Sequence, residues 1–134
     1  MTTSTTEFPP EFAGFHENAR AKRLAFPFCR PCGRFHWYPM PRCPACRGRE
    51  IEWRPVSGKA EVFSFTRVQH PFDKARTEAL PYIVALLTFA DAPGVRFVTN
   101  IVGDRLDEVK IGQAVEARFT ADRNGEPLVV FSVA

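Results

Sequence analysis

The sequence contains no long hydrophobic run and no export signal. No apolar stretch approaches the roughly 20 residues needed to cross a bilayer. The first residues, MTTSTTEF, lack both a basic start and an apolar core. We therefore expect a soluble protein of the cytoplasm with no membrane contact. In that reducing compartment, closely spaced cysteines are metal ligands more often than disulfides.

The sequence also lacks the motifs of common active sites. No G-x-S-x-G elbow surrounds Ser57, Ser64 or Ser132, no P-loop is present, and no G-x-G-x-x-G follows an expected strand. We therefore expect a protein that is not an enzyme.

Composition limits the architecture to about one ordinary domain. The 134 residues are 45% apolar and include 13 Phe, which is enough apolar side chain for a folded core. Net charge is only +3, yet residues 20–54 hold nine Lys or Arg against two Glu. This basic region attracts nucleic acid or a phosphorylated cofactor, or it is a solvated surface that compensates an anionic metal centre. Both interpretations stay open.

The order of patterns predicts a mainly β protein with a short N-terminal helix. Phe12, Phe15 and Ala19 fall on one helical face, and we expect this helix from Pro10 to Arg23. After PVSG, alternating runs separated by turn residues predict strands that close into a barrel without exposed edges. The five expected strands cover residues 60–68, 82–90, 95–102, 114–121 and 128–134.

Three regions are expected along the chain. Residues 1–24 form the tail and helix, residues 25–56 a small ribbon that is too small to bury a core of its own, and residues 57–134 the barrel. Alternation in the first barrel strand predicts two faces. One face carries Val62, Ser64 and Thr66, and the other carries Phe63, Phe65 and Arg67.

The four cysteines carry the strongest chemical signal. CRPCGRFHWYPMPRCPAC holds two Cys-x-x-Cys pairs separated by ten residues. Each such turn points two sulfurs at one ion, so a hairpin between the pairs completes a tetrahedral site with ligands Cys29, Cys32, Cys43 and Cys46. A full protein shell leaves no position for water or substrate, so we expect a structural Zn²⁺ ion, with iron in a rubredoxin-like site as the rival. Binding in such sites contributes on the order of 10 kcal/mol, comparable to the whole stability of a small domain.

Two glycines adjoin the cysteine pairs, and the three histidines of the chain do not follow a metal-ligand spacing. Gly33 and Gly48 fit tight knuckles that need an unusual backbone angle. His16, His36 and His70 are scattered, and we expect packed or surface rings rather than metal ligands.

Aromatic side chains are dense between and after the cysteine pairs. Beside Arg residues they offer stacking surfaces for a base, an adenine or a protein partner. The alternative is that they fill the seam between ribbon and barrel. The candidate ligand- or partner-binding residues are Arg34, Phe35, Trp37, Tyr38, Trp53, Phe63 and Phe65.

The cysteine frame and the segments that follow it resemble a known family. FCRPCG, YPMPRCPAC, EWRPVSGKAEVFSFTRV, PYIVALLTFAD and VKIGQAVEARF are similar, in this order and over residues 10–131, to proteins that combine a rubredoxin-like zinc ribbon with an OB-fold. This is the domain of unknown function thirty-five. The resemblance implies zinc on the four cysteines. Ala60 and Arg47 stand where the family usually has glycine, and Met40 separates a usual Pro-Pro pair.

The resemblance also implies a function. Members of the family are non-catalytic partners of thiolase-like enzymes of acyl-CoA, lipid or steroid metabolism, such as acyltransferases, synthases and aldolases. We therefore expect an accessory or scaffold subunit in a hetero-oligomer, with acyl-CoA as a ligand that it helps to position. The ribbon and the adjacent barrel face would contact the enzyme.

Two other functions stay open. An OB-fold can bind single-stranded nucleic acid, but the barrel half holds nine basic and ten acidic residues, which makes this function the weaker expectation. Electron transfer through iron is the third hypothesis.

Overall fold

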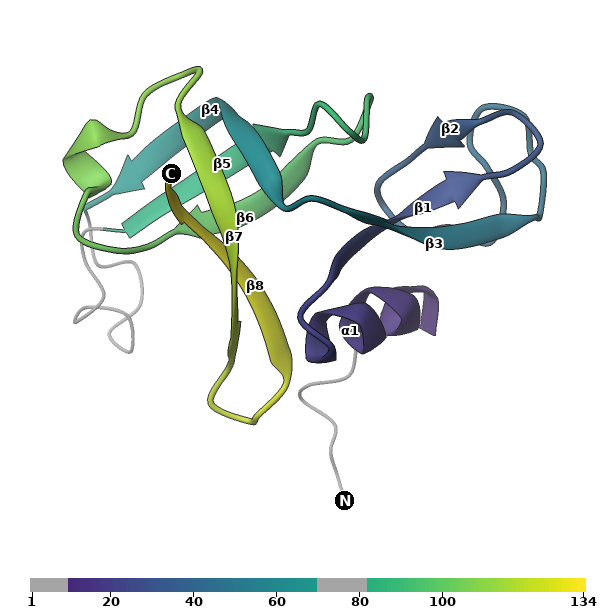
Figure 1. The fold of residues 1–134 in the computed structure, drawn as a ribbon, viewed down its shortest axis with the longest axis horizontal. Helices are drawn as coiled ribbons and strands as arrows, with labels where there is room; N and C mark the ends of the chain where they lie inside the picture. The colour runs from purple at the N-terminus through teal and green to yellow at the C-terminus, as the bar shows by residue number, and fades with distance from the viewer. Residues whose placement is uncertain (1–9, 70–81) are drawn as a thin grey trace.

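A small open sheet lies beside a closed barrel, and one short helix packs against both (Figure 1). The structure is a computed structural model that describes residues 10–69 and 82–134. The small sheet has the order β2-β1-β3, and the barrel has the order β4-β5-β6-β8-β7. The expected mainly β fold, with an N-terminal helix and a five-stranded barrel, is confirmed. The elements are η2 (Pro10–Phe12), α1 (Ala13–Arg20), β1 (Leu24–Cys29), β2 (Arg34–Phe35), β3 (Ile51–Val56), β4 (Lys59–Val68), β5 (Tyr82–Thr88), β6 (Phe97–Ile101), η4 (Leu106–Glu108), β7 (Ala114–Ala121) and β8 (Pro127–Val133).

The helix ends three residues earlier than expected. The backbone N–H of Lys22 donates to the Ala19 carbonyl at 2.9 Å, and that of Arg23 donates to the Asn18 carbonyl at 2.8 Å. Lys22 has a left-handed backbone with φ of 61°. These bonds form a C-terminal cap whose left-handed position is usually glycine. Because lysine occupies it here, the sequence gives no signal that the helix ends at this point. Among the described residues, no helix is long and apolar enough to cross a membrane.

Strand β4 contains a bulge that reverses its faces. The register shifts between Val62 and Ser64, so one extra residue is inserted there. Val62 is buried, Phe63 is 49% exposed, and Phe65 packs partly buried against the core. The expected alternation is therefore wrong beyond Val62, because the extra residue sends Ser64 outward and Phe65 inward.

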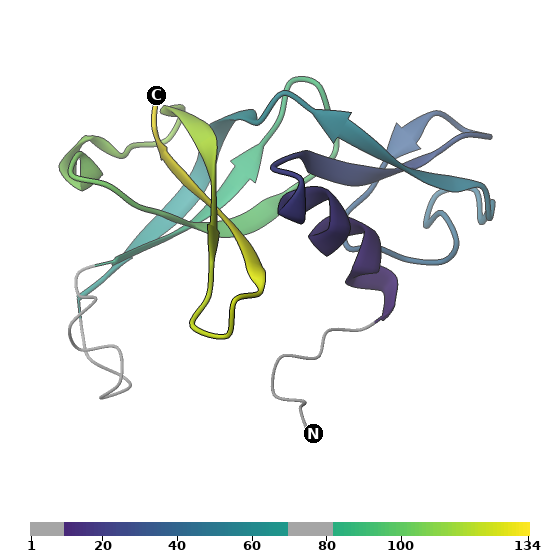
Figure 2. The same cartoon turned by 60° about the horizontal axis from the view of Figure 1, so that its bottom comes forward.

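The barrel closes weakly between β6 and β8. The two strands are parallel there, and within the described residues their register contains one pair, Ile101 with Phe131. The Thr99 hydroxyl donates to the Val129 carbonyl at 2.9 Å and adds a side-chain link across this junction. Helix α1 lies between β8 and β1 near this junction (Figure 2).

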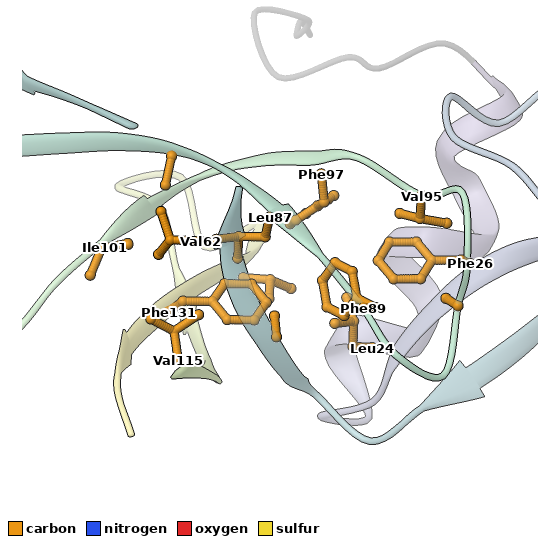
Figure 3. Packing of buried hydrophobic residues seen from close by; sticks show 14 of the residues in the cluster. Leu24, Phe26, Val62, Leu87, Phe89, Val95, Phe97, Ile101, Val115 and Phe131 are labelled. Carbon is orange, nitrogen blue, oxygen red and sulfur yellow. The ribbon is translucent and has the colours of Figure 1, made fainter. Parts of the chain in front are cut away.

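Aromatic rings join the small sheet to the barrel. Phe26 of β1 is fully buried, and its ring centroid lies 4.9 Å from that of Phe89 and 5.6 Å from that of Phe97. Figure 3 shows Phe26 and Leu24 in one continuous cluster with Phe89 and the barrel interior. Trp37 adds a ring 5.3 Å from Phe97. One core therefore serves both sheets. The boundary that we expected between ribbon and barrel, at residues 56 and 57, stays a prediction.

We predict that Phe26→Ala destabilises the whole chain. Removing a fully buried ring leaves a cavity where the two sheets meet, so the free energy of unfolding should fall by about 3–5 kcal/mol. Tyr38→Ala is the control, because Tyr38 is 66% exposed and should cost about 1 kcal/mol or less. Urea unfolding of the metal-loaded proteins measures both. Equal losses in the two variants would contradict a shared core.

Candidate metal centre

The four cysteines come from two turns that face each other. Cys29 ends β1, and Cys32 follows in the turn before β2. Cys43 and Cys46 lie in the loop before β3. All four Sγ atoms lie within 4.8 Å of one another. The residues predicted from spacing are therefore brought together, and the cluster could bind a metal ion.

The sulfur spacing fits a single tetrahedral ion. Four thiolates at about 2.3 Å from one ion place their sulfurs about 3.8 Å apart. The Cys29 and Cys46 sulfurs are 3.5 Å apart, and those of Cys32 and Cys43 are 3.6 Å apart. A disulfide needs about 2.05 Å, and all four cysteines are free. Each short distance joins one turn to the other, so a bound ion would tie the two turns together.

The two cysteine turns have the same backbone design. The Gly33 N–H donates to the Cys29 carbonyl at 2.8 Å, and the Arg47 N–H donates to the Cys43 carbonyl at 2.8 Å. Both residues are left-handed, with φ of 71° for Gly33 and 66° for Arg47. The expected backbone angle at Gly33 is confirmed. In the second turn Arg47, at the position that Gly33 holds in the first, adopts the strained angle itself.

Gly48 has a different role from the one expected. The left-handed residue of the second turn is Arg47, so the prediction of an unusual angle at Gly48 is wrong. A Cβ atom at Gly48 would lie 3.2 Å from the Cys46 sulfur and 3.5 Å from the Cys29 sulfur. Its N–H also donates to the Cys46 sulfur at 3.4 Å. Glycine is needed here because the backbone approaches the sulfurs closely.

Hydrogen bonding and burial shift the pKa values of the cysteine thiols in opposite directions. Backbone hydrogen bonding, first from Cys46 and then from Ala45, lowers the pKa of Cys43 to about 6, although burial opposes this. A backbone hydrogen bond from Cys32 lowers the pKa of Cys29, but burial and the neighbouring sulfurs outweigh it and raise that pKa to about 12. Burial also raises the pKa of Cys32. Without a cation Cys43 therefore ionises before Cys29 and Cys32, whereas a divalent ion would hold all four sulfurs as thiolates.

Most of the candidate aromatic residues pack against the hydrophobic core. Phe35, Trp37, Trp53 and Phe65 are partly buried against the core. The Trp53 indole lies so close to the helix that a Cβ atom on Gly14 would clash with it. Gly14 was not singled out from the sequence, since a glycine within a helix gives no sign of the ring that covers it.

The other candidates are exposed. Tyr38 and Phe63 are 66% and 49% exposed, and Arg34 is exposed on β2. The structure thus separates the predicted binding residues into two groups. Arg34, Tyr38 and Phe63 face solvent, and the remaining rings pack against the core.

His16 and His36 lie outside the sulfur cluster. His36 is only 7% exposed, neither ring nitrogen has a hydrogen-bond partner among the described residues, and burial lowers its pKa. It is a packed ring, one of the two alternatives expected. Burial also lowers the pKa of His16. His70 lies outside the described residues.

The closed barrel and the adjoining four-sulfur cluster define an OB-fold protein with a candidate cysteine metal centre. Residues 53–120 match the family described as ChsH2, C-terminal OB-fold domain, and the chain belongs to this family.

Three known proteins are similar to this chain. The solved structure titled "Ltp2-ChsH2(DUF35) aldolase" contains a chain that is 29% identical, with a TM-score of 0.82 over 94% of this chain and 96% of that one. A DUF35-family protein of unknown function from Sulfolobus solfataricus shares the fold, with a TM-score of 0.66 and 20% identity over 97% of this chain and 90% of the other. A probable enoyl-CoA hydratase alpha subunit from Thermomonospora curvata is 33% identical over 103 residues, which are 77% of this chain but only 31% of that protein.

We predict opposite effects for substitutions at Arg47 and Gly48. Arg47→Gly removes left-handed strain and should keep or tighten metal binding, with stability equal to or up to about 1 kcal/mol above that of the wild type. Gly48→Ala pushes the backbone away from the sulfurs and should weaken metal binding by about tenfold or more. Competition with a chromophoric chelator measures both affinities. Equal weakening in the two variants would contradict the assigned roles.

We also predict that metal affinity falls steeply as pH falls. In the metal-free chain the raised pKa values keep Cys29 and Cys32 protonated at neutral pH, so binding must displace at least those two protons. Near pH 7 the affinity should therefore fall by about a hundredfold or more for each unit of decrease. The fall should steepen below the pKa of about 6 of Cys43, where a further proton competes. Chelator competition across this range tests it, and an affinity independent of pH would contradict thiolate ligation.

Proposed function

We propose that this chain is a non-catalytic accessory subunit that binds a thiolase-like acyl-CoA enzyme, of the acyltransferase, synthase or aldolase type, in a hetero-oligomer. One observation carries the proposal. The chain is similar over nearly its whole length to a chain of the Ltp2-ChsH2(DUF35) aldolase. A whole-length match at 29% identity extends beyond the barrel to the ribbon and helix, so it concerns a complete arrangement rather than a common fold alone.

The proposed role includes helping to position acyl-CoA for the partner enzyme. Support comes from the relative named as a probable enoyl-CoA hydratase alpha subunit, although this chain spans only 31% of that protein. The sequence carries no serine elbow, P-loop or dinucleotide motif that would give the chain an acyl-transfer or nucleotide chemistry of its own. We therefore assign the chemistry to the partner.

The proposed metal is a structural Zn²⁺ ion held by Cys29, Cys32, Cys43 and Cys46. The donor set supports it, because four sulfurs fill a tetrahedral shell and leave no position for water or substrate. The ion would tie the two cysteine turns of the ribbon to each other. Iron in the same shell would colour the purified protein and would favour electron transfer instead.

Single-stranded nucleic-acid binding has less support. Such binding needs exposed rings on which bases stack. Four of the six candidate rings, Phe35, Trp37, Trp53 and Phe65, pack against the core instead. Oligonucleotide binding that weakens steeply with salt would restore this alternative.

We predict that affinity-tagged chain, expressed in its native source, co-purifies with a thiolase-like protein in a fixed stoichiometry. The complex should act on acyl-CoA, and the isolated chain should show no turnover. Mass spectrometry of the purified material and an acyl-CoA assay of both samples provide the test. Isolation as a lone monomer, or turnover by the isolated chain, would contradict the proposal.

A further inference from the structure

Strand β5 has the sequence of a strand that is covered on both faces. Ile83, Ala85 and Leu87 point into the barrel and are almost completely buried. The alternate residues Val84 and Leu86 are also apolar, although they face away from the core and are only half-buried. A strand with one solvated face normally alternates apolar and polar side chains, and a continuous apolar run is typical of a strand covered on both sides.

Strand β7 of the same barrel shows the ordinary pattern. Its inward side chains are apolar, whereas its outward side chains are Glu116, Arg118 and Thr120. Solvent therefore suits the outer face of β7. The outer face of β5 differs because it is apolar, as in a strand that is covered on both faces.

Neighbouring strands extend this apolar outer face. Strand β5 lies between β4 and β6 (Figure 1). In the strand registers Leu86 lies between Ser64 of β4 and Val98 of β6. Val98 is 60% exposed, and the β4 bulge turns Phe63 outward, where it is 49% exposed. We define the outer β5 patch as Phe63, Val84, Leu86 and Val98. It is formed by three adjacent strands, and its exposed side chains are large.

A groove continues the patch around the edge of β6. Val98 also lines a groove of about 480 Å³ between the barrel, helix α1 and the ribbon. Tyr38 and Leu128, which are 66% and 43% exposed, line the same groove. Exposed apolar side chains that form a continuous surface of this kind mark an interaction site rather than scattered surface residues.

Arg96 is a cation on the patch that has no counter-ion within residues 10–69 and 82–134. The Arg96 guanidinium lies over the Phe63 ring, 4.6 Å from its centroid. The guanidinium donates a hydrogen bond to the neighbouring Val95 carbonyl at 3.3 Å, and no ion pair of Arg96 occurs among the described residues. An apolar centre with an unpaired guanidinium at its margin is complementary to a protein surface that offers apolar side chains and a carboxylate.

We propose that the outer β5 patch, with Arg96 at its margin, is the surface that docks the thiolase-like partner subunit. This inference rests on the proposed function and adds the face of the barrel that is used. A second copy of this chain is a poorer occupant. In a two-fold contact the patch would meet itself and bring two unpaired Arg96 side chains onto one apolar surface.

Two substitutions with matched controls test the docking surface. Val98→Lys places a charge in the patch, and Arg96→Glu reverses its cation. Thr120→Lys and Arg118→Glu make the corresponding changes on the exposed outer face of β7. The probe is the thiolase-like subunit that co-purifies with the wild-type chain, and calorimetry measures its Kd for each variant. We expect Val98→Lys and Arg96→Glu to weaken binding by about tenfold or more, and both controls to bind like the wild type.

The outcomes separate this inference from the proposed function. If the wild type binds no thiolase-like subunit, the proposed function fails. If the wild type binds and both patch variants bind equally well, the outer β5 patch is overturned while the proposed function stands. Thermal melting of each variant shows that a loss of binding does not come from unfolding.

Two further measurements test the other occupants. A wild-type homodimer in light scattering that Val98→Lys converts to a monomer would assign the patch to a second copy and overturn the inference. Saturable binding of decanoic acid to the lone chain that Val98→Lys abolishes would assign it to an acyl chain and also overturn the inference. A monomer that binds no decanoic acid leaves the partner subunit as the occupant and supports it.

Discussion

The convergence of four cysteine sulfurs determines how the loop between β2 and β3 is held. Strand β2 has only two residues, and no helix or strand lies between Phe35 and Ile51. A segment of this kind cannot bury enough apolar surface to fix its own path. The short sulfur distances join the two turns across this loop, so one ion among the sulfurs would replace the missing core.

The second constraint is the aromatic junction between the two sheets. Phe26 extends from the small sheet toward Phe89 and Phe97 of the barrel side, and Trp37 and Phe15 complete the contact. Each edge-to-face ring pair adds to the burial of a large apolar area. The ribbon and barrel therefore share one core, and the ribbon places Tyr38 in the groove that borders β6. The sulfur cluster and the proposed docking surface are linked through this junction.

Patterns that depend on local spacing were predicted from the sequence. The two Cys-x-x-Cys pairs identified the sulfur cluster, and alternation with turn residues located the barrel strands to within a few residues. Features that depend on tertiary contacts were not predicted. The bulge at Val62 and Ser64 has no local signature, so the faces of β4 were assigned wrongly beyond it. Lys22 and Arg47 adopt backbone angles usually left to glycine, which hid both a helix end and a knuckle. The burial of Trp37 and Trp53 follows from the way the two sheets pack, and composition could not distinguish that from ligand binding.

X-ray absorption at the metal edge of the purified native protein would show which atoms surround the ion at the cysteine cluster. We predict one zinc ion per chain with a shell of four sulfurs at about 2.3 Å. A shell that contains nitrogen or oxygen, or a fully folded chain that carries no metal, would contradict it.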